Sequence, residues 1–297
     1  MAESSTIGRR LAGAGLTMAA AATALLVLVA SQGDAAATVD LHDAQIGEAR
    51  RTSITVKIAP AVPGVAVSGA RAAGRPIVVI DPGHGGRDPG AIGVSGSIAE
   101  KDLTLALARE LRDRLVERGR VRVALTRDSD RYLTLEQRAG VARGLGASLF
   151  LSLHMDSAPN PLARGASVYS LSDVASDAEA ARFAHAQNAG GVVGATDGSV
   201  RSMLSDLALR SQMSASAELA SRLVRKSAWR IALRPEPHRF ATFHVLRRAE
   251  APAVLFESGY LSNVDDEALL RSPEHRAAIV ASLVETIEAD VAARSRR

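Results

Sequence analysis

The clearest absence in this sequence is cysteine, of which its 297 residues contain none. The chain can form no disulfide bond, and any metal ion that it binds must be held by nitrogen and oxygen atoms. A chain without thiols suits an oxidising compartment, but this absence does not by itself fix the location.

Aromatic residues are the second scarcity, with one Trp, three Tyr and five Phe. Because 47% of the residues are hydrophobic, the core must consist mainly of Ala, Leu, Val and Ile, and the length suits one or two domains. The net charge is only +4, and no basic run is interleaved with aromatic residues as a nucleic-acid groove requires. We therefore expect no nucleic-acid partner.

The N-terminal segment has the three parts of a secretory signal. Arg9 and Arg10 precede an uncharged stretch over residues 11–32, and the small residues 35–37 supply a cleavage site. The pattern predicts a signal peptide over residues 1–37 and export to the periplasm or cell envelope, by the general or the twin-arginine route. The alternative is an uncleaved membrane anchor, since the stretch is long enough to span a bilayer although only mildly apolar.

After residue 37 the chain changes character twice. Residues 38–75 contain a short strand at 52–58 and several Pro and Gly residues, which is typical of a linker. From residue 76 to 297, apolar strand-like runs alternate with amphipathic helical segments. The alternation predicts one α/β domain: a mostly parallel twisted sheet flanked by helices.

Residues 171–212 interrupt this alternation. An Ala-rich helical stretch at 172–189 is followed by a glycine-rich joint and by a second helical stretch at 200–213. An insertion of this size is large for a connection between elements of a compact domain. We expect a helical insertion near the active site, acting as a lid or as a partner surface.

Four polar residues stand where the predicted strands end or a helix begins. His84, His154 and Glu257 follow buried apolar runs, and Glu100 opens a helix. In open α/β sheets, ligands bind outside the carboxyl ends of the strands. Two imidazoles and two carboxylates there are the chemistry of a catalytic zinc site, with three ligands for the metal and one carboxylate that moves a proton.

Each of these residues also has a simpler interpretation. A histidine after a strand is often a hydrogen-bonded structural residue, and the glycine-rich loop around His84 could cradle a phosphate, although it lacks the lysine of a P-loop. A carboxylate at Glu100 complements the helix dipole. A buried Glu257 is costly unless it pairs or binds something. The spacing alone does not decide which glutamate is a metal ligand and which moves the proton.

Five ordered motifs identify a family resemblance: VIDPGHGG (79–86), EKDLTL (100–105), LTR (125–127), SLHMD (152–156) and ESGYLSN (257–263). Together they resemble the zinc-dependent N-acetylmuramoyl-L-alanine amidases of the type-3 family over about residues 76–293. The resemblance implies that His84, Glu100 and His154 bind Zn²⁺ and that Glu257 is the catalytic base and acid. It implies cleavage of the amide between N-acetylmuramic acid and L-alanine in peptidoglycan, during wall remodelling and daughter-cell separation.

The resemblance also bears on regulation and on two competing functions. In some members a segment like 171–212 folds a helix over the zinc until an activator protein releases it, and Glu179 could then reach the metal unless it lies on a solvated helix face. Met155 stands where the family usually has Ala, so we expect a different pocket shape. A zinc carboxypeptidase-like peptidase would need a basic clamp, and no Arg is clearly committed to one. An inactive wall-binding regulatory protein would have no use for Glu257.

Overall fold

The computed structural model describes residues 28–29, 36–41, 52–57, 64–69, 74–189 and 200–295. The chain divides into two compact units, residues 1–58 and 59–297. In the first unit three strands pair antiparallel in the order β1-β2-β3: β1 (Leu28–Val29), β2 (Ala36–Leu41) and β3 (Thr52–Lys57). Strand β3 confirms the strand expected at 52–58. Most of the predicted signal peptide and linker lies outside the described residues, so their boundaries stay predictions.

The second unit is built on a seven-stranded sheet, of order β4-β6-β5-β7-β10-β8-β9. Its strands are β4 (Val67–Ser68), β5 (Ile77–Pro82), β6 (Arg122–Leu125), β7 (Leu149–Asp156), β8 (Ala166–Leu171), β9 (Leu233–Ala241) and β10 (Ala253–Tyr260). The four strands β6, β5, β7 and β10 run parallel, as do β8 and β9, whereas β4–β6 and β10–β8 are antiparallel. The predicted α/β fold with a mostly parallel sheet is confirmed.

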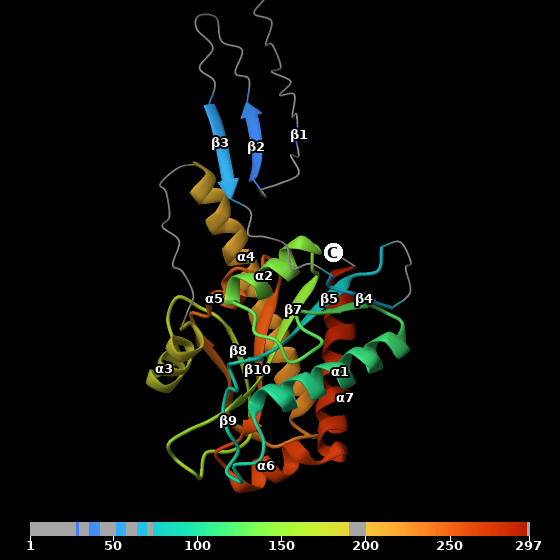
Figure 1. Cartoon of the computed structure of the whole chain (residues 1–297), viewed down its shortest axis with the longest axis vertical. Helices are drawn as coiled ribbons and strands as arrows, with labels where there is room; N and C mark the ends of the chain where they lie inside the picture. The colour runs from blue at the N-terminus through green and yellow to red at the C-terminus, as the bar shows by residue number, and fades with distance from the viewer. Residues whose placement is uncertain are drawn as a thin grey trace, which may run out of the picture. The chain divides into compact units, whose positions relative to one another are not determined.

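Helices cover both faces of this sheet (Figure 1). They are α1 (Glu100–Arg118), α2 (Leu135–Gly144), α3 (Ala178–Gln187), α4 (Val200–Ser227), α5 (His244–Arg247), α6 (Val264–Arg271) and α7 (Pro273–Arg294). Local signals set their ends: α1 stops at Gly119 in the left-handed conformation, and α2 begins with a capping box between Thr134 and Gln137.

Two hydrophobic cores, one on each face, follow from the alternation of side chains along the strands. In β7, Leu151, Leu153 and Met155 pack in the core that contains residues of α1, α4 and α7. Phe150 packs in the other core, with residues of α2, α3 and α5. Because His154 follows Leu153, and Glu257 follows Phe256 of the first core, both project toward the second face.

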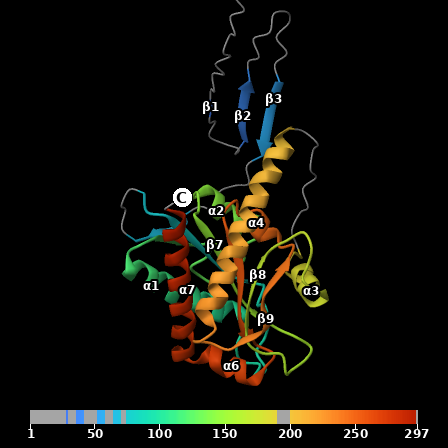
Figure 2. The same cartoon turned by 180° about the vertical axis from the view of Figure 1, so that it is seen from behind.

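The predicted insertion contains two helices that differ in how they join the fold. Helix α3 confirms the helix expected within 172–189. Helix α4 contains the stretch expected at 200–213 and continues without a break to Ser227, and it runs beside α7 (Figure 2). The glycine-rich joint at 190–199 lies outside the described residues. The second half of the insertion is thus continuous with a core helix.

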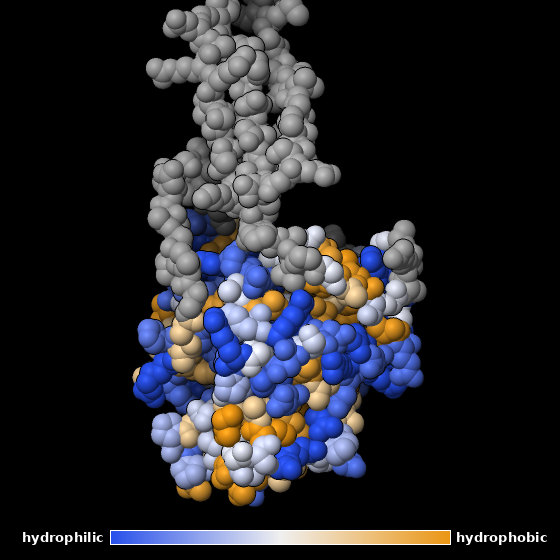
Figure 3. Space-filling model, in the orientation of Figure 1, coloured by the Kyte–Doolittle hydropathy of each residue, from blue (hydrophilic) through white to orange (hydrophobic). Residues whose placement is uncertain are grey.

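The surface of the second unit is mixed, as the scattered arginines predict. On the face shown in Figure 3, hydrophilic residues predominate and hydrophobic residues form small separate groups. Among the described residues, no helix combines the length and the apolar composition that crossing a membrane would require.

Candidate metal centre

Three of the predicted residues meet at the carboxyl edge of the sheet. His84 lies two residues beyond β5, His154 lies in β7, and Glu100 is the first residue of α1. The Glu100 carboxylate lies between the two rings, with Oε2 3.1 Å from His84 Nε2 and Oε1 2.9 Å from His154 Nδ1. One ligand atom from each residue lies within 4.8 Å of the other two, and this is the only such cluster in the described part of the chain.

Both oxygens of Glu100 are held by backbone donors as well. Ala91 N–H donates to Oε2 at 2.9 Å and Met155 N–H donates to Oε1 at 3.0 Å. Burial alone would raise the pKa of Glu100, but the hydrogen bonds and charges of His154 and His84 outweigh it and hold this pKa well below its usual range. The carboxylate is therefore charged and fixed in direction, as a metal ligand must be.

Two glycines make room for the cluster. A Cβ on Gly83 would lie 2.4 Å from the His154 ring, and a Cβ on Gly90 would lie 2.4 Å from Glu100 Oε2 and 2.7 Å from His84 Cδ2. Gly90 also has a φ of +68°, which favours glycine. The glycines of this loop thus allow the side chains of the cluster to lie close to the loop backbone.

His84 is held in an unusual conformation by its partners. Its φ is 58°, a strained value for a residue with a side chain. Asp88 lies 2.9 Å from His84 Nδ1, which directs Nε2 toward Glu100 and leaves that atom buried without a hydrogen-bond partner. Burial lowers the pKa of His154, whereas at His84 the nearby carboxylates of Glu100 and Asp88 outweigh burial and raise the pKa.

Two buried arginines fix the loop that carries His84. Arg138 donates to Asp81 at 2.8 Å and to the carbonyl oxygens of Pro82 and His84 at 2.7 and 2.6 Å. Arg127 donates to the carbonyl oxygens of Pro82, Gly83 and Lys101 at 3.0, 2.8 and 2.8 Å. Arg127 belongs to one of the sequence motifs, whereas Arg138 was missed by sequence reasoning; an arginine on the inner face of a helix was the available signal.

Glu257 lies beside this cluster without any hydrogen bond. It pairs with His154 in the β10–β7 register, its side chain is fully buried, and neither carboxylate oxygen has a partner. Burial, together with the negative charges of Asp156 and Glu100, raises the pKa of Glu257 well above its usual value. A buried carboxylate with no partner costs stability, and such groups are concentrated at functional sites.

The donor set fits zinc. Two imidazole nitrogens and one carboxylate, with no thiolate, are the ligands of many catalytic zinc sites, and Nε2 of His84 is a buried nitrogen that makes no hydrogen bond, which fits a metal ligand. Glu179, the further carboxylate considered from the sequence, is not part of this cluster. It pairs with Arg234 at 3.0 Å and with Arg239 at 3.2 Å.

Two cavities flank the site. One of about 240 Å³ is lined by His84, His154 and residues 186–189 at the end of α3. The other, of about 710 Å³, is lined by Asp156, Tyr260 and residues of α3, and Ala186 borders both. The helical insertion therefore lies at the site, as predicted. Met155 lines neither cavity, because it packs in the core on the opposite face; the expectation that it reshapes the pocket is wrong.

Comparisons with known proteins agree with the geometry. A family model described as N-acetylmuramoyl-L-alanine amidase (Amidase_3) matches residues 78–289. The chain is 35% identical over 223 residues to the N-acetylmuramoyl-L-alanine amidase AmiA of Escherichia coli, an alignment that covers 73% of this chain and 76% of that protein. It is 32% identical to the amidase AmiC of Neisseria meningitidis, of which it covers 52%. The catalytic domain of CwlV, an N-acetylmuramoyl-L-alanine amidase from Bacillus (Paenibacillus) polymyxa var. colistinus, is 28% identical with a TM-score of 0.56, over 73% of this chain and 98% of that domain.

Proposed function

This chain belongs to the N-acetylmuramoyl-L-alanine amidase family, and on that premise we propose that it hydrolyses the amide between N-acetylmuramic acid and L-alanine in peptidoglycan, with a zinc ion held by His84, Glu100 and His154. One observation supports this assignment above the others. The unpartnered, buried carboxylate of Glu257 lies beside a His–Glu–His cluster, and a proton-transferring carboxylate next to three metal ligands is what hydrolysis requires.

The residues divide the chemistry between them. A bound zinc ion polarises the scissile carbonyl and lowers the pKa of a water molecule toward about 7. In the hydrolysis the oxygen of the attacking water would bond to the carbonyl carbon, and Glu257 would take a proton from that water and pass it to the amide nitrogen as the C–N bond breaks, which leaves a carboxylic acid and a free amine. Burial and the neighbouring charges of Asp156 and Glu100 raise the pKa of Glu257, which suits a group that must accept a proton and hold it until the leaving amine takes it. Asp88 keeps His84 oriented, as outer carboxylates do for metal-binding histidines.

We further propose that the protein is exported to the cell envelope and that an activator protein acts on the 171–212 insertion. Residues 186–189 line the cavity that contains His84 and His154, so the end of α3 restricts access to the cluster. N-terminal sequencing of the exported protein tests the first proposal, with cleavage expected near residue 37. The opposite outcome, an intact N-terminus embedded in the membrane, would establish the anchor alternative.

Product analysis of digested cell walls tests the reaction itself. Mass spectrometry should detect stem peptides with a free N-terminal alanine, chelators should abolish their release, and zinc should restore it. Glycan fragments in their place would refute amide cleavage. Shortening of the stem peptide from its carboxyl end would instead establish the peptidase alternative.

Substitution Glu257→Gln tests the role given to that residue. We expect turnover to fall by roughly 10²–10⁴-fold, as is usual when a general base is lost, while the zinc content measured by metal analysis stays unchanged. Loss of zinc from a folded variant would show that Glu257 is a ligand. Full activity in this variant would favour a different proton carrier.

A further inference from the structure

The larger cavity beside the metal cluster has its own recognition chemistry. We propose that Arg234 and Tyr260 bind a free carboxylate of the stem peptide, and that Glu179 occupies this carboxylate site in the free protein. The inference deepens the proposed function and rests on it, because it concerns the part of the substrate that lies beyond the scissile amide.

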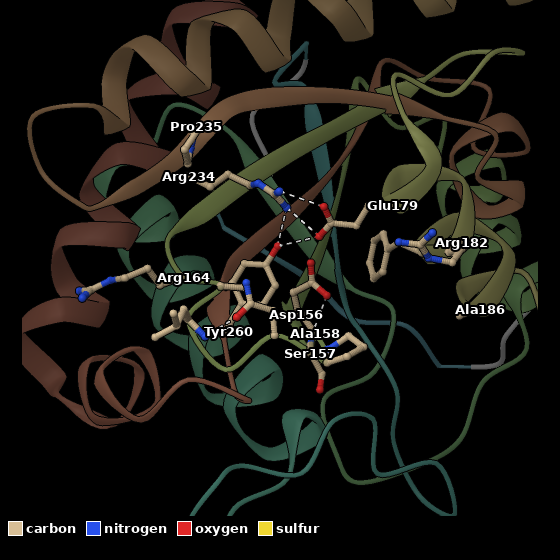
Figure 4. Close-up of a pocket in the computed structure, with 15 residues that line it drawn as sticks. Asp156, Ser157, Ala158, Arg164, Glu179, Arg182, Ala186, Arg234, Pro235 and Tyr260 are labelled. Carbon is tan, nitrogen blue, oxygen red and sulfur yellow. Dashed lines mark hydrogen bonds and ion pairs between the residues drawn. The ribbon is translucent and has the colours of Figure 1, made fainter.

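Three elements meet at this site, as Figure 4 shows. Glu179, in the first turn of α3, points both carboxylate oxygens at Arg234 on β9, with Nη2–Oε2 at 3.0 Å and Nη1–Oε1 at 3.2 Å. The hydroxyl of Tyr260, at the end of β10, accepts from Arg234 at 2.5 Å and lies 3.5 Å from Glu179 Oε1. Two parallel bonds from a guanidinium, with a phenol beside them, are the usual recognition of a carboxylate.

The site remains suited to an anion once Glu179 leaves. Arg239 contacts Glu179 at 3.2 Å but is also paired with Asp177, whereas Glu179 is the only carboxylate that pairs with Arg234 among the described residues. The Arg234 side chain is only 18% exposed and its Nε is buried without a hydrogen bond. The Glu179 side chain, by contrast, is 39% exposed and can return to water at little cost. An arginine left half-buried and unpaired favours a replacement carboxylate.

The position of the site matches the direction in which a substrate peptide must run. In the β10–β7 register, Tyr260 pairs with Asp156 just beyond the pair of Glu257 and His154. The cavity of about 710 Å³ begins there and has a size typical of ligand pockets. Its walls combine apolar side chains (Pro159, Leu162, Phe183 and Pro235) with the basic Arg164 and Arg182 and the acidic Asp156. A peptide whose first amide lies at the metal cluster continues into this cavity and meets Arg234.

Two consequences separate this arrangement from an ordinary ion pair. A substrate with a free carboxylate must compete with Glu179, so removing the charge of Glu179 strengthens its binding. A substrate in which that carboxylate is an amide gains nothing from the same change, because an amide cannot replace the charge that Arg234 requires.

The experiment uses the full-length protein carrying Glu257→Gln, loaded with zinc, and two peptides. They are L-alanyl-γ-D-glutamyl-L-lysine and the same peptide with the glutamyl α-carboxylate converted to an amide. Isothermal titration calorimetry should show that adding Glu179→Gln raises the affinity for the carboxylate peptide about tenfold and leaves the affinity for the amide peptide unchanged. Asp173→Asn is the matched control, because Asp173 pairs with Arg247 outside the cavity, and it should alter neither affinity.

Adding Arg234→Gln, in either background, should remove the preference for the carboxylate. Equal affinities for the two peptides in the Glu179→Gln protein, or a preference that survives Arg234→Gln, would overturn the proposal. Thermal midpoints show whether each variant keeps its fold. If Glu179→Gln detaches α3, the test uses the Arg234→Gln protein in which Glu179 is intact. In that protein the preference for the carboxylate peptide over the amide peptide should be lost.

Kinetic measurements on proteins that retain Glu257 distinguish a failure of the carboxylate site from a failure of the proposed amidase function. Muramyl forms of both peptides are supplied, and kcat/KM is measured for each. Failure to cleave either substrate would refute the amidase assignment, while the binding preference is still measured independently. Cleavage of both with equal kcat/KM in the Glu179→Gln enzyme would refute the carboxylate site and leave the amidase assignment intact.

Discussion

Two pairs of buried or partly buried arginines surround the candidate metal centre and α3, and they bind different kinds of acceptor. Arg127 and Arg138 are buried and donate mainly to backbone carbonyl oxygens of the loop around His84. Arg234 and Arg239 donate to the side-chain carboxylates of α3 and its cap. A backbone carbonyl cannot leave without unfolding its segment, whereas a carboxylate on a helix can be replaced by another carboxylate.

The comparison separates the fixed part of the site from the exchangeable part. Arg127 and Arg138 hold the backbone of the loop around His84, so the position of His84 changes only if the fold changes. The second pair holds α3, which also contacts the core through Ala180, Ala184 and the ring of Phe183. The function proposed above, in which the site holds a metal and admits a large polymer, would need both kinds of contact.

The largest effect is expected from Arg138→Met. The change leaves the buried Asp81 without its cationic partner and frees the carbonyl oxygen of His84, so we expect a loss of roughly 3–5 kcal/mol in unfolding free energy and at least tenfold weaker zinc binding. Denaturant unfolding and metal titration measure the two quantities. Arg239→Gln should leave zinc affinity unchanged, and equal losses in both variants would remove the distinction between the two pairs.

Gly90→Ala comes next and tests the close approach at the cluster. The added Cβ would collide with Glu100 and His84, so we expect a loss of about 1–3 kcal/mol in stability together with weaker zinc binding. Gly96→Ala is a closely matched control, because Gly96 has nearly the same φ, +69° against +68°, but a Cβ added there would have no atom within 4 Å. If both variants keep normal zinc affinity, Gly90 serves only the backbone conformation.

Releasing α3 from the core should have a smaller effect than the two changes above, and it should raise activity where they weaken zinc binding. Ala184 is buried on α3, so Ala184→Glu places a charge in the core contact and should release the helix, which raises the basal rate several-fold without lowering zinc affinity. Ala181→Glu, at an exposed position of the same helix, should leave the rate unchanged. An unchanged rate in a folded Ala184→Glu protein would show that α3 does not restrict access.

Acidification should loosen α3 before it loosens α1. Burial would raise the pKa of Asp177, but its hydrogen bond with Arg239 outweighs this and lowers the pKa to about 2; Arg234 lowers the pKa of Glu179 as well. These depressed values mean that the stabilisation is fully present above about pH 4 and is lost as the pH falls toward 2. Hydrogen-exchange protection factors should decline in α3 over this window while those of α1 persist; a simultaneous decline would contradict it.

The fold and the meeting of His84, Glu100, His154 and Glu257 at one edge of the sheet were predictable because local patterns carry them. Apolar runs gave the central strands, and the polar residues that follow those runs gave the cluster at their carboxyl ends. Strand β9 escaped prediction because its sequence, LRPEPHRFA, has two prolines and no alternation, and becomes a strand only by pairing with β8.

The partners of Glu179 escaped for the same reason. They lie 55 and 60 residues further along the chain, on the strand that could not be foreseen. Its expected reach toward the metal followed from the resemblance alone, whereas the actual contacts depend on which strand packs beside α3. The burial of Arg138 likewise depends on how α2 packs over β5, which helical spacing does not determine.

Helix α4 has a mechanical consequence. With 28 residues it is a rod about 42 Å long, and it carries the C-terminal part of the insertion. Its described residues 206–211 are mostly exposed, whereas Leu219 and Leu223 are buried in the core and Ser216 accepts a hydrogen bond from Ala253 at the start of β10. The buried half of α4 therefore connects the insertion to the strand that carries Glu257 through direct contacts.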